Sequence, residues 1–149
     1  MPIVIKKRKA QKPGDTAGFL LWKAHNTWQR EIKSILKPFK LTHVQYVLLA
    51  SLEWLLNDKK SVSQAKLAKF IKTDVMMISV VMRELISRGF VERQPNPKDT
   101  RGYLLTLTGL GESLIQDAVA SVKSFEDSFF SDVTHPTLHQ ELSVLAESV

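Results

Sequence analysis

Residues 85–111 read LISRGFVERQPNPKDTRGYLLTLTGLG, and this stretch decides the fold. Gly89 stands where a helix commonly ends on a left-handed residue. Two short β-favouring runs follow, at 90–94 and 103–107, and the two prolines and the glycine between them predict the turn of a hairpin. Thr108 is a favourable N-cap for another helix. The stretch therefore predicts a helix end, a hairpin and a helix start.

Two short helices are predicted just before this stretch. Ser63 can cap the segment SQAKLAKFI, residues 63–71, and Asp74 can cap a second helix that ends near residue 88. A turn of a few residues separates the two helices, which is the helix-turn-helix pattern.

Two more helices are predicted on the N-terminal side. Pro13 and Gly14 lead into Asp15, which we expect to be the N-cap of a helix that Pro38 ends. Thr42 and Gln45 match a capping box, in which each side chain accepts a hydrogen bond from the other residue's backbone N–H. The capping box predicts that a second helix starts here.

The C-terminal side is also helical. A long apolar stripe follows Thr108, and Thr134 with Pro136 predicts the start of a last helix. The order is then helix, helix, helix-turn-helix, hairpin, helix, helix, and the strands total only about ten residues. We therefore predict a mainly α fold with a small β wing, a winged helix-turn-helix flanked by long N- and C-terminal helices.

Charge is unevenly distributed along the chain. Of the net +6, residues 1–12 carry +5 and residues 59–101 carry +6, whereas residues 102–149 carry −6. A positive segment of this size predicts contact with a polyanion, and a chance excess of surface lysines is the alternative. The basic part of the chain coincides with the predicted helix-turn-helix and wing.

Several classes of function find no support in the sequence. There is no cysteine, which excludes disulfides and thiolate metal sites, and no phosphate-binding loop or nucleophile motif, so we predict neither an enzyme nor a cofactor. His135 and His139 stand four residues apart, but Pro136 starts a helix between them, so we predict no metal site. No apolar run approaches a membrane span, and the N-terminus lacks the apolar region of a secretory signal, so we expect a cytoplasmic protein.

The order of elements, together with LAKFI at 67–71, LISRGFVER at 85–93, the Asp-x-Arg at 99–101 and LLTLTGLG at 104–111, resembles the MarR family of bacterial winged helix-turn-helix regulators. The resemblance covers roughly residues 15–148. It implies a homodimer that intertwines its first and last two helices, binds a pseudo-palindromic operator as a repressor, and is released in many members by a small molecule or another signal.

A domain organisation is also predicted. Residues 1–12 are basic and lack an apolar period, so we expect a flexible arm, and the resemblance implies that residues 13–149 form a single MarR-like domain. Within that domain, residues 13–40 and 108–149 are the dimerisation helices, and residues 41–107 are the winged helix-turn-helix. Whether the arm touches DNA stays open.

The helix that follows Asp74 is the expected recognition helix. Since each residue turns a helix by 100°, its core face is predicted to be Ile78, Val81, Met82 and Leu85. By resemblance, the positions that enter the major groove are Val75, Met76, Met77, Ser79 and Val80, where relatives commonly carry polar side chains. We hypothesise that Met76, Met77 and Val80 contact thymine methyl groups, while Ser79 and Arg83 hydrogen-bond to phosphates or bases. The alternative is that either methionine turns inward and fills space.

The hairpin and the preceding lysines supply the remaining DNA contacts that the resemblance implies. Arg101 is expected in the minor groove, with Asp99 holding it through a charge-assisted hydrogen bond and Lys98 on a phosphate. Lys66 and Lys69 are expected to contact phosphates. The alternative for the hairpin is an ordinary solvated turn.

An effector pocket is expected by analogy between the dimer helices and the DNA-binding lobe, lined by Trp22, His25, Trp28 and Tyr46. A second reading of function stays open as well. The apolar recognition helix also fits a winged-helix module that binds another protein and has no sequence-specific contact with DNA.

Overall fold

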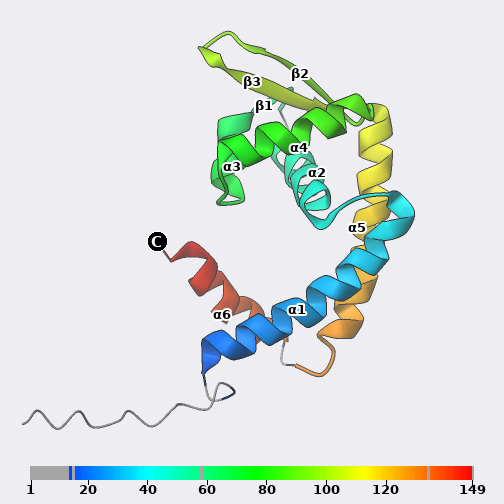
Figure 1. The fold of residues 1–149 in the computed structure, drawn as a ribbon, viewed down its shortest axis with the longest axis vertical. Helices are drawn as coiled ribbons and strands as arrows, with labels where there is room; N and C mark the ends of the chain where they lie inside the picture. The colour runs from blue at the N-terminus through cyan, green and yellow to red at the C-terminus, as the bar shows by residue number, and fades with distance from the viewer. Residues whose placement is uncertain (1–13, 15, 58, 134, 149) are drawn as a thin grey trace, which may run out of the picture.

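The computed structural model describes residues 14, 16–57, 59–133 and 135–148, and within them it has six α-helices and a small antiparallel sheet (Figure 1). The basic arm at 1–12 lies outside the described residues. In chain order, the elements are α1 (Ala17–Leu36), the 3-10 turn η2 (Lys37–Phe39), α2 (His43–Leu56), β1 (Val62–Ser63), α3 (Gln64–Phe70), α4 (Val75–Ser87), β2 (Val91–Asn96), β3 (Asp99–Leu107), α5 (Gly109–Phe129) and α6 (His135–Glu147). The predicted class, mainly α with a small β wing, is confirmed.

Most helix starts follow from local capping. Thr42 and Gln45 form the predicted capping box, with reciprocal hydrogen bonds of 3.1 and 3.0 Å. The side chains of Ser63 and Thr108 accept from Lys66 N–H and Gly111 N–H, and Gly89 ends α4 with φ +80°. These predictions are confirmed because each depends on residues within one helical turn.

The start of α1 was predicted one residue too early. Its N-cap is Thr16, whose hydroxyl accepts the Phe19 N–H at 3.2 Å, whereas Asp15 lies outside the described residues. Both residue types are good N-caps, and the pattern alone does not choose between neighbours.

The sheet is larger than the predicted hairpin. β1 pairs with β3 through Val62 and Leu105, which gives three antiparallel strands in the order β1-β3-β2. β2 and β3 extend further than predicted and leave only residues 97–98 between them. Pro95 is compatible with β2 because β2 is an edge strand. The extra strand was missed because two residues carry no recognisable alternation.

One hydrophobic core joins α1, α2, α3, α4, the sheet and α5. Its fully buried members include Ile32, Leu48, Leu52, Leu67, Ile78, Met82, Leu85, Leu105 and Ile115. The predicted core face of α4 is confirmed, since Ile78, Met82 and Leu85 are fully buried and Val81 packs against the core. Burial of this face fixes which side of α4 points outward.

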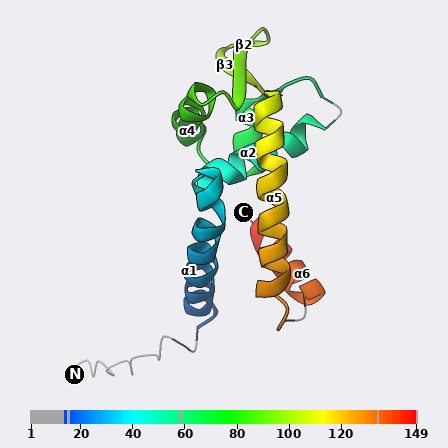
Figure 2. The ribbon, with the colours of Figure 1, turned by 90° about the vertical axis from the view of Figure 1, so that its right-hand side faces the viewer.

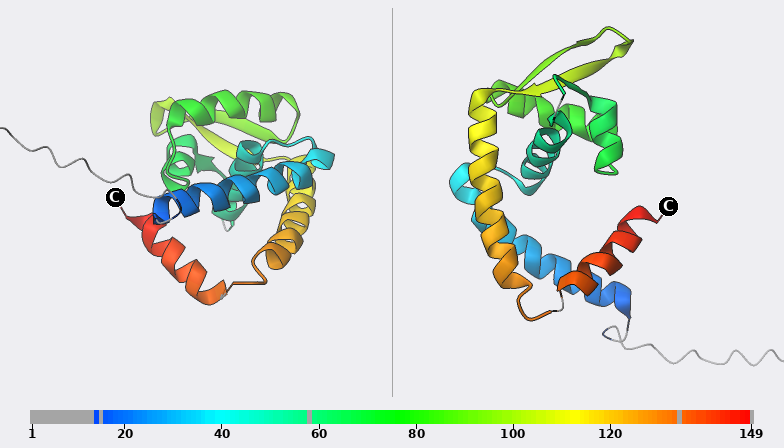
Figure 3. Two further views of the ribbon diagram at one scale, coloured as in Figure 1. Left: turned by 60° about the horizontal axis from the view of Figure 1, so that its bottom comes forward. Right: turned by 180° about the vertical axis from the view of Figure 1, so that it is seen from behind.

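α2, α3, α4 and the sheet form the winged lobe. α1, α5 and α6 lie outside the lobe and form a long helical extension. α5 leaves the lobe beside the sheet and passes α1, and α6 turns back at its far end (Figures 1 and 2). The views from below and behind show α6 standing apart from the lobe along most of its length (Figure 3). None of the described helices is long and apolar enough to cross a membrane.

Candidate nucleic-acid interface

The outward side of α4 is apolar in its first two turns. Met76 and Val80 are 72% and 62% exposed, and Val75 is exposed beside them. Arg83 is also exposed one turn further along, whereas Met77 and Ser79 are half-buried on the two flanks. The structure therefore separates the two adjacent methionines, because Met76 points directly away from the core and Met77 points sideways.

The N-terminus of α4 is fixed by local hydrogen bonds. The Asp74 carboxylate accepts the Met76 N–H at 2.9 Å, and the Thr73 N–H donates to the Ala68 carbonyl at 3.0 Å. Lys72 lies between α3 and α4 with φ +53°, and its ammonium donates to the Ala146 carbonyl at the end of α6. The turn between α3 and α4 is thus hydrogen-bonded to both of these helices and to the end of α6.

Basic side chains stand on the exposed side of α3. Lys66 and Lys69 are exposed, while Leu67 and Ala68 between them are buried. A side-chain hydrogen bond with Lys59, followed by repulsion from the same ammonium, lowers the pKa of Lys66. Lys66 and Lys69 both present positive charge to solvent.

The tip of the wing carries Lys98, Asp99 and Arg101. Asn96 accepts the Lys98 N–H and Asp99 accepts the Arg101 N–H, both at 3.0 Å. Lys98 and Arg101 are exposed.

The role predicted for Asp99 needs a correction. Its hydrogen bond runs to the backbone of Arg101 and not to the guanidinium, and Lys123–Asp127 is the only ion pair among the residues that the structure describes. The geometry is that of an Asx turn, which a residue spacing of two favours because the carboxylate reaches the backbone before it reaches a long side chain. Asp99 therefore shapes the loop that presents Arg101.

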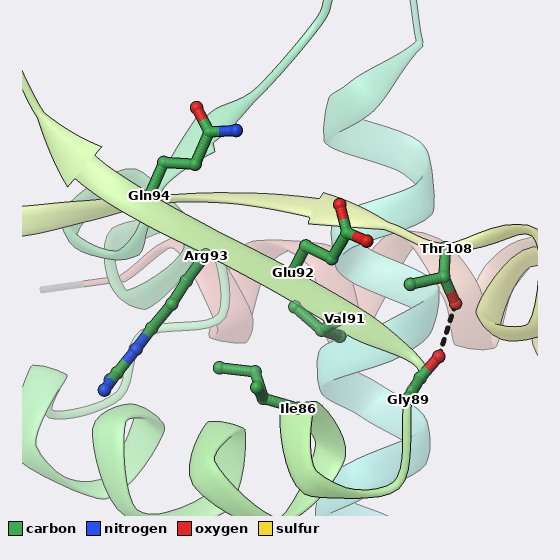
Figure 4. A pocket seen from close by; sticks show the side chains of 7 residues that line it. All are labelled: Ile86, Gly89, Val91, Glu92, Arg93, Gln94 and Thr108. Carbon is green, nitrogen blue, oxygen red and sulfur yellow. Dashed lines mark hydrogen bonds between the residues drawn. The ribbon is translucent and has the colours of Figure 1, made fainter.

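Arg93 is a basic residue of the wing that the sequence analysis missed. Its guanidinium lies over the ring of Tyr103 on the neighbouring strand, 4.3 Å from the ring centroid. It also lines a hollow of about 510 Å³ between the end of α4 and β2, together with Ile86, Val91 and Gln94 (Figure 4). In the register of the hairpin, Tyr103 is paired with Pro95, so Arg93 lies diagonally across from Tyr103 on the neighbouring strand. The sequence could have revealed this contact only if the length of the hairpin had been predicted correctly.

At the base of the hollow, Thr108 ties the start of α5 to the end of α4. Its hydroxyl donates to the Gly89 carbonyl at 2.6 Å, the bond drawn in Figure 4, and accepts the Gly111 N–H at 3.0 Å. One side chain thus connects both helices that flank the wing.

The four residues expected to line an effector pocket lie on α1, which carries Trp22, His25 and Trp28, and on α2, which carries Tyr46. His25 and Trp28 are neighbours on α1, and the Trp28 ring makes an edge-on contact of 5.0 Å between centroids with His43, which was not predicted. Tyr46 instead lines a hollow of about 510 Å³ with Glu53, Trp54 and Val119, and Trp22 is exposed on α1.

The aromatic cluster His25–Trp28–His43 has two chemical features of note. The Trp28 Nε1–H is buried and has no hydrogen-bond acceptor among the described residues. Burial, and then the charges of His25 and Lys33, lower the pKa of His43. No group of three or more potential metal ligands occurs in the described part of the chain.

Comparison with known proteins identifies a matching family and a similar relative. A family model described as the MarR family matches residues 41–103. The chain is 42% identical to the uncharacterized HTH-type transcriptional regulator YdcH of Bacillus subtilis. The alignment spans 123 residues, which are 83% of this chain and 84% of that protein.

Solved structures agree with this match. A mutant of MarR from E. coli complexed with operator DNA is 25% identical, with a TM-score of 0.76 over 86% of this chain and 91% of that one. CouR from Rhodococcus jostii bound to p-coumaroyl-CoA is 26% identical, with a TM-score of 0.76 over 91% of this chain and 93% of that one. The chain therefore belongs to the MarR family of DNA-binding, winged helix-turn-helix transcriptional regulators and is not an enzyme.

Proposed function

We propose that this protein is a cytoplasmic homodimer that represses transcription by binding a pseudo-palindromic operator and is released by a small-molecule effector. The observation that carries the proposal is the exposed surface of the lobe, on which the outward side of α4, the lysines of α3 and the wing tip all face solvent. The operator complex of the E. coli relative supports the same use of this surface.

DNA contact is proposed for the residues that this surface presents. Lys66, Lys69 and Lys98 neutralise phosphates, and Arg101 enters the minor groove at the wing tip. α4 lies in the major groove with its N-terminal turns against the bases; this part of the interface contains Val75, Met76, Met77, Ser79, Val80 and Arg83. Asp99 contributes by shaping the loop before Arg101.

Dimer formation is supported by apolar side chains that the single chain leaves exposed. On α1 and α6 these are Phe19, Leu20, Leu21, Trp22, Leu142, Val144 and Leu145. No other described element packs extensively along α6. Exposure of apolar side chains on this scale is costly in a monomer, so a second copy that covers α1 and α6 is the favoured arrangement.

The effector is proposed to bind at the aromatic cluster His25–Trp28–His43, where α1 meets α2 of the lobe. The unsatisfied Trp28 Nε1–H would donate to an oxygen of the effector, and the rings would stack on an aromatic or acyl group. Relatives of the same fold bind such molecules, as CouR does p-coumaroyl-CoA. Because Trp28 lies on α1 and His43 on α2 of the lobe, a ligand here would change how the lobe is oriented on α1. That change would alter the separation of the two α4 helices, which must match successive major grooves.

The proposal is tested by binding of genomic DNA fragments at several salt concentrations. A DNA-binding dimer selects one preferred fragment and loses affinity steeply as salt rises. Because a homodimer carries each lysine twice, Lys66→Ala and Lys69→Ala are each expected to lower the salt slope by about two. Lys123→Ala is the matched control, since Lys123 pairs with Asp127 on α5, and it should leave the slope unchanged.

A winged-helix module that binds another protein would select no fragment and show no steep salt slope, which would contradict the proposal. A reporter gene behind the selected fragment then decides the direction of control. Repression requires higher expression in a deletion strain, and lower expression there would contradict it.

A further inference from the structure

The outward stripe of α4 has a chemical asymmetry. Its members are Met76, Val80, Arg83 and Ser87, all exposed, and they lie opposite the buried Ile78, Met82 and Leu85. The half of the stripe nearest the N-terminus is entirely apolar, and the half nearest the C-terminus is polar. We call Met76 and Val80 the apolar face of α4.

Polar groups around the apolar face are already engaged or turned aside. The Asp74 carboxylate is occupied by the Met76 N–H at 2.9 Å, and Thr73 and Ser79 are half-buried. The first two turns of α4 thus present almost no side-chain donor or acceptor to a partner. Base edges cannot be distinguished there by paired hydrogen bonds, so a different form of recognition is required.

The major groove has one apolar group, the C5 methyl of thymine. We propose that Met76 and Val80 recognise thymine methyl groups of the operator by van der Waals contact. The inference rests on the proposed function, since it needs α4 in the major groove, and it deepens that function by naming the feature of the sequence that is read.

DNA is favoured over an apolar protein partner by the charge around the face. Residues 59–101 contain ten basic and four acidic side chains, and Lys66, Lys69 and Arg83 are exposed on or near α4. Even with the neighbouring Val75, which is also exposed, the apolar surface at the start of α4 is too small to hold a protein by itself. It is well suited to a polyanion whose groove exposes methyl groups.

The two side chains differ in what they add. Met76 is long and flexible and adapts to a methyl group in more than one position, whereas Val80 is short and stiff and requires close approach of the helix. Met77, half-buried on the flank, is assigned no contact with a methyl group. The adjacent methionines therefore form a matched pair for the experiment.

The experiment begins with selection of a duplex from a random double-stranded DNA library by the full-length protein. Each thymine of the selected half-site is then replaced by deoxyuridine, which removes only the C5 methyl group and retains the base pair. The dissociation constant is measured at fixed salt. Loss of one contacted methyl is expected to weaken binding about fourfold.

Protein variants assign the effect to its side chain. In Met76→Ala, Met76→Gln or Val80→Ala, the penalty for deoxyuridine at the contacted thymine should fall to within about 1.5-fold, because the partner of the methyl is gone. In Met77→Ala it should persist at about fourfold. Circular dichroism and a sedimentation measurement confirm that each variant is folded and has the oligomeric state of the unsubstituted protein.

Two outcomes overturn the inference while the proposed function stands. One is specific binding that no deoxyuridine substitution changes, and the other is a penalty that persists unaltered in the Met76 and Val80 variants. If the library yields no enriched duplex, the proposed function is itself wrong and the inference is wrong with it.

Discussion

Gly111 lies so close to the backbone of Phe90 that a Cβ on Gly111 would overlap the Phe90 carbonyl oxygen and stand 3.1 Å from its Cα. The same carbonyl accepts the Thr108 N–H at 3.1 Å, so it is not free to move. The start of α5 thus packs directly on the chain that leads from α4 into the wing. This contact fixes how the lobe is attached to α5.

Gly111→Ala is expected to lower the free energy of unfolding by roughly 1–3 kcal/mol, because the added methyl must displace backbone. Gly109→Ala is the matched control, since nothing lies within 4 Å of a Cβ there, and it should be neutral or stabilise by about 0.4–1 kcal/mol. Guanidinium unfolding at one protein concentration measures both. Equal effects of the two substitutions would contradict the packing argument.

Asp99 is expected to act through the shape of its loop and not through its charge. Asp99→Asn retains an oxygen that accepts the Arg101 N–H and should preserve DNA affinity or raise it slightly as a negative charge is lost. Asp99→Ala loses the turn and should weaken binding. Fluorescence anisotropy with the selected duplex compares them, and equal weakening in both variants would show that the carboxylate charge is needed.

Arg101→Ala should weaken operator binding by roughly 1–3 kcal/mol for each half-site, as expected for a groove contact. Lys123→Ala, far along α5, serves as the control for loss of a positive charge. A loss below a few tenths of a kcal/mol would remove Arg101 from the interface.

Arg93 and Tyr103 are expected to stabilise the wing together. A double-mutant cycle with Arg93→Ala and Tyr103→Leu should give a coupling of about 0.5–1 kcal/mol in the free energy of unfolding, since Arg93 is exposed. Arg93→Lys retains the charge but loses the flat guanidinium, and it should recover only part of the stability. Zero coupling would show that the stacked arrangement contributes nothing.

His43 makes stability depend on pH. Its pKa is lowered in the folded chain, chiefly by burial, so the unfolded chain binds the proton more tightly and folding weakens as the pH falls. The loss begins near the unfolded pKa of about 6.5 and is complete below the folded pKa. Unfolding free energies at pH 7.5 and 5.5 should differ less in His43→Gln than in the unsubstituted protein.

His25→Gln provides a graded control for this effect. It removes the second cause of the lowered pKa and leaves burial, the first cause, in place. NMR titration should therefore show the pKa of His43 rising only part of the way to its ordinary value. A complete return would mean that charge and not burial dominates.

Local signals account for the parts of the fold that could be predicted. The capping box of Thr42 and Gln45, the cap at Asp74 and the left-handed Gly89 each depend on residues within about one turn. The buried side of α4 follows from its period. The composition of residues 59–101 likewise shows which part of the chain is positive, whatever its conformation.

Contacts between distant segments could not be predicted in this way. β1 pairs with a strand more than 40 residues away, and His43 joins Trp28 only when α2 packs on α1. Asp99 was assigned to the wrong group of Arg101, since the spacing of two residues does not choose between backbone and side chain. The hydrogen bond from Lys72 to the end of α6 spans 74 residues.

The sequence by itself determined the helices, the hairpin, the family resemblance and the charged segment, because propensity, capping and periodicity are local properties. Only the tertiary structure decided that Met76 is exposed while Met77 is half-buried, and that Arg93 lies over Tyr103. The physical reason is that a side chain's exposure and partners depend on which other segments pack beside it.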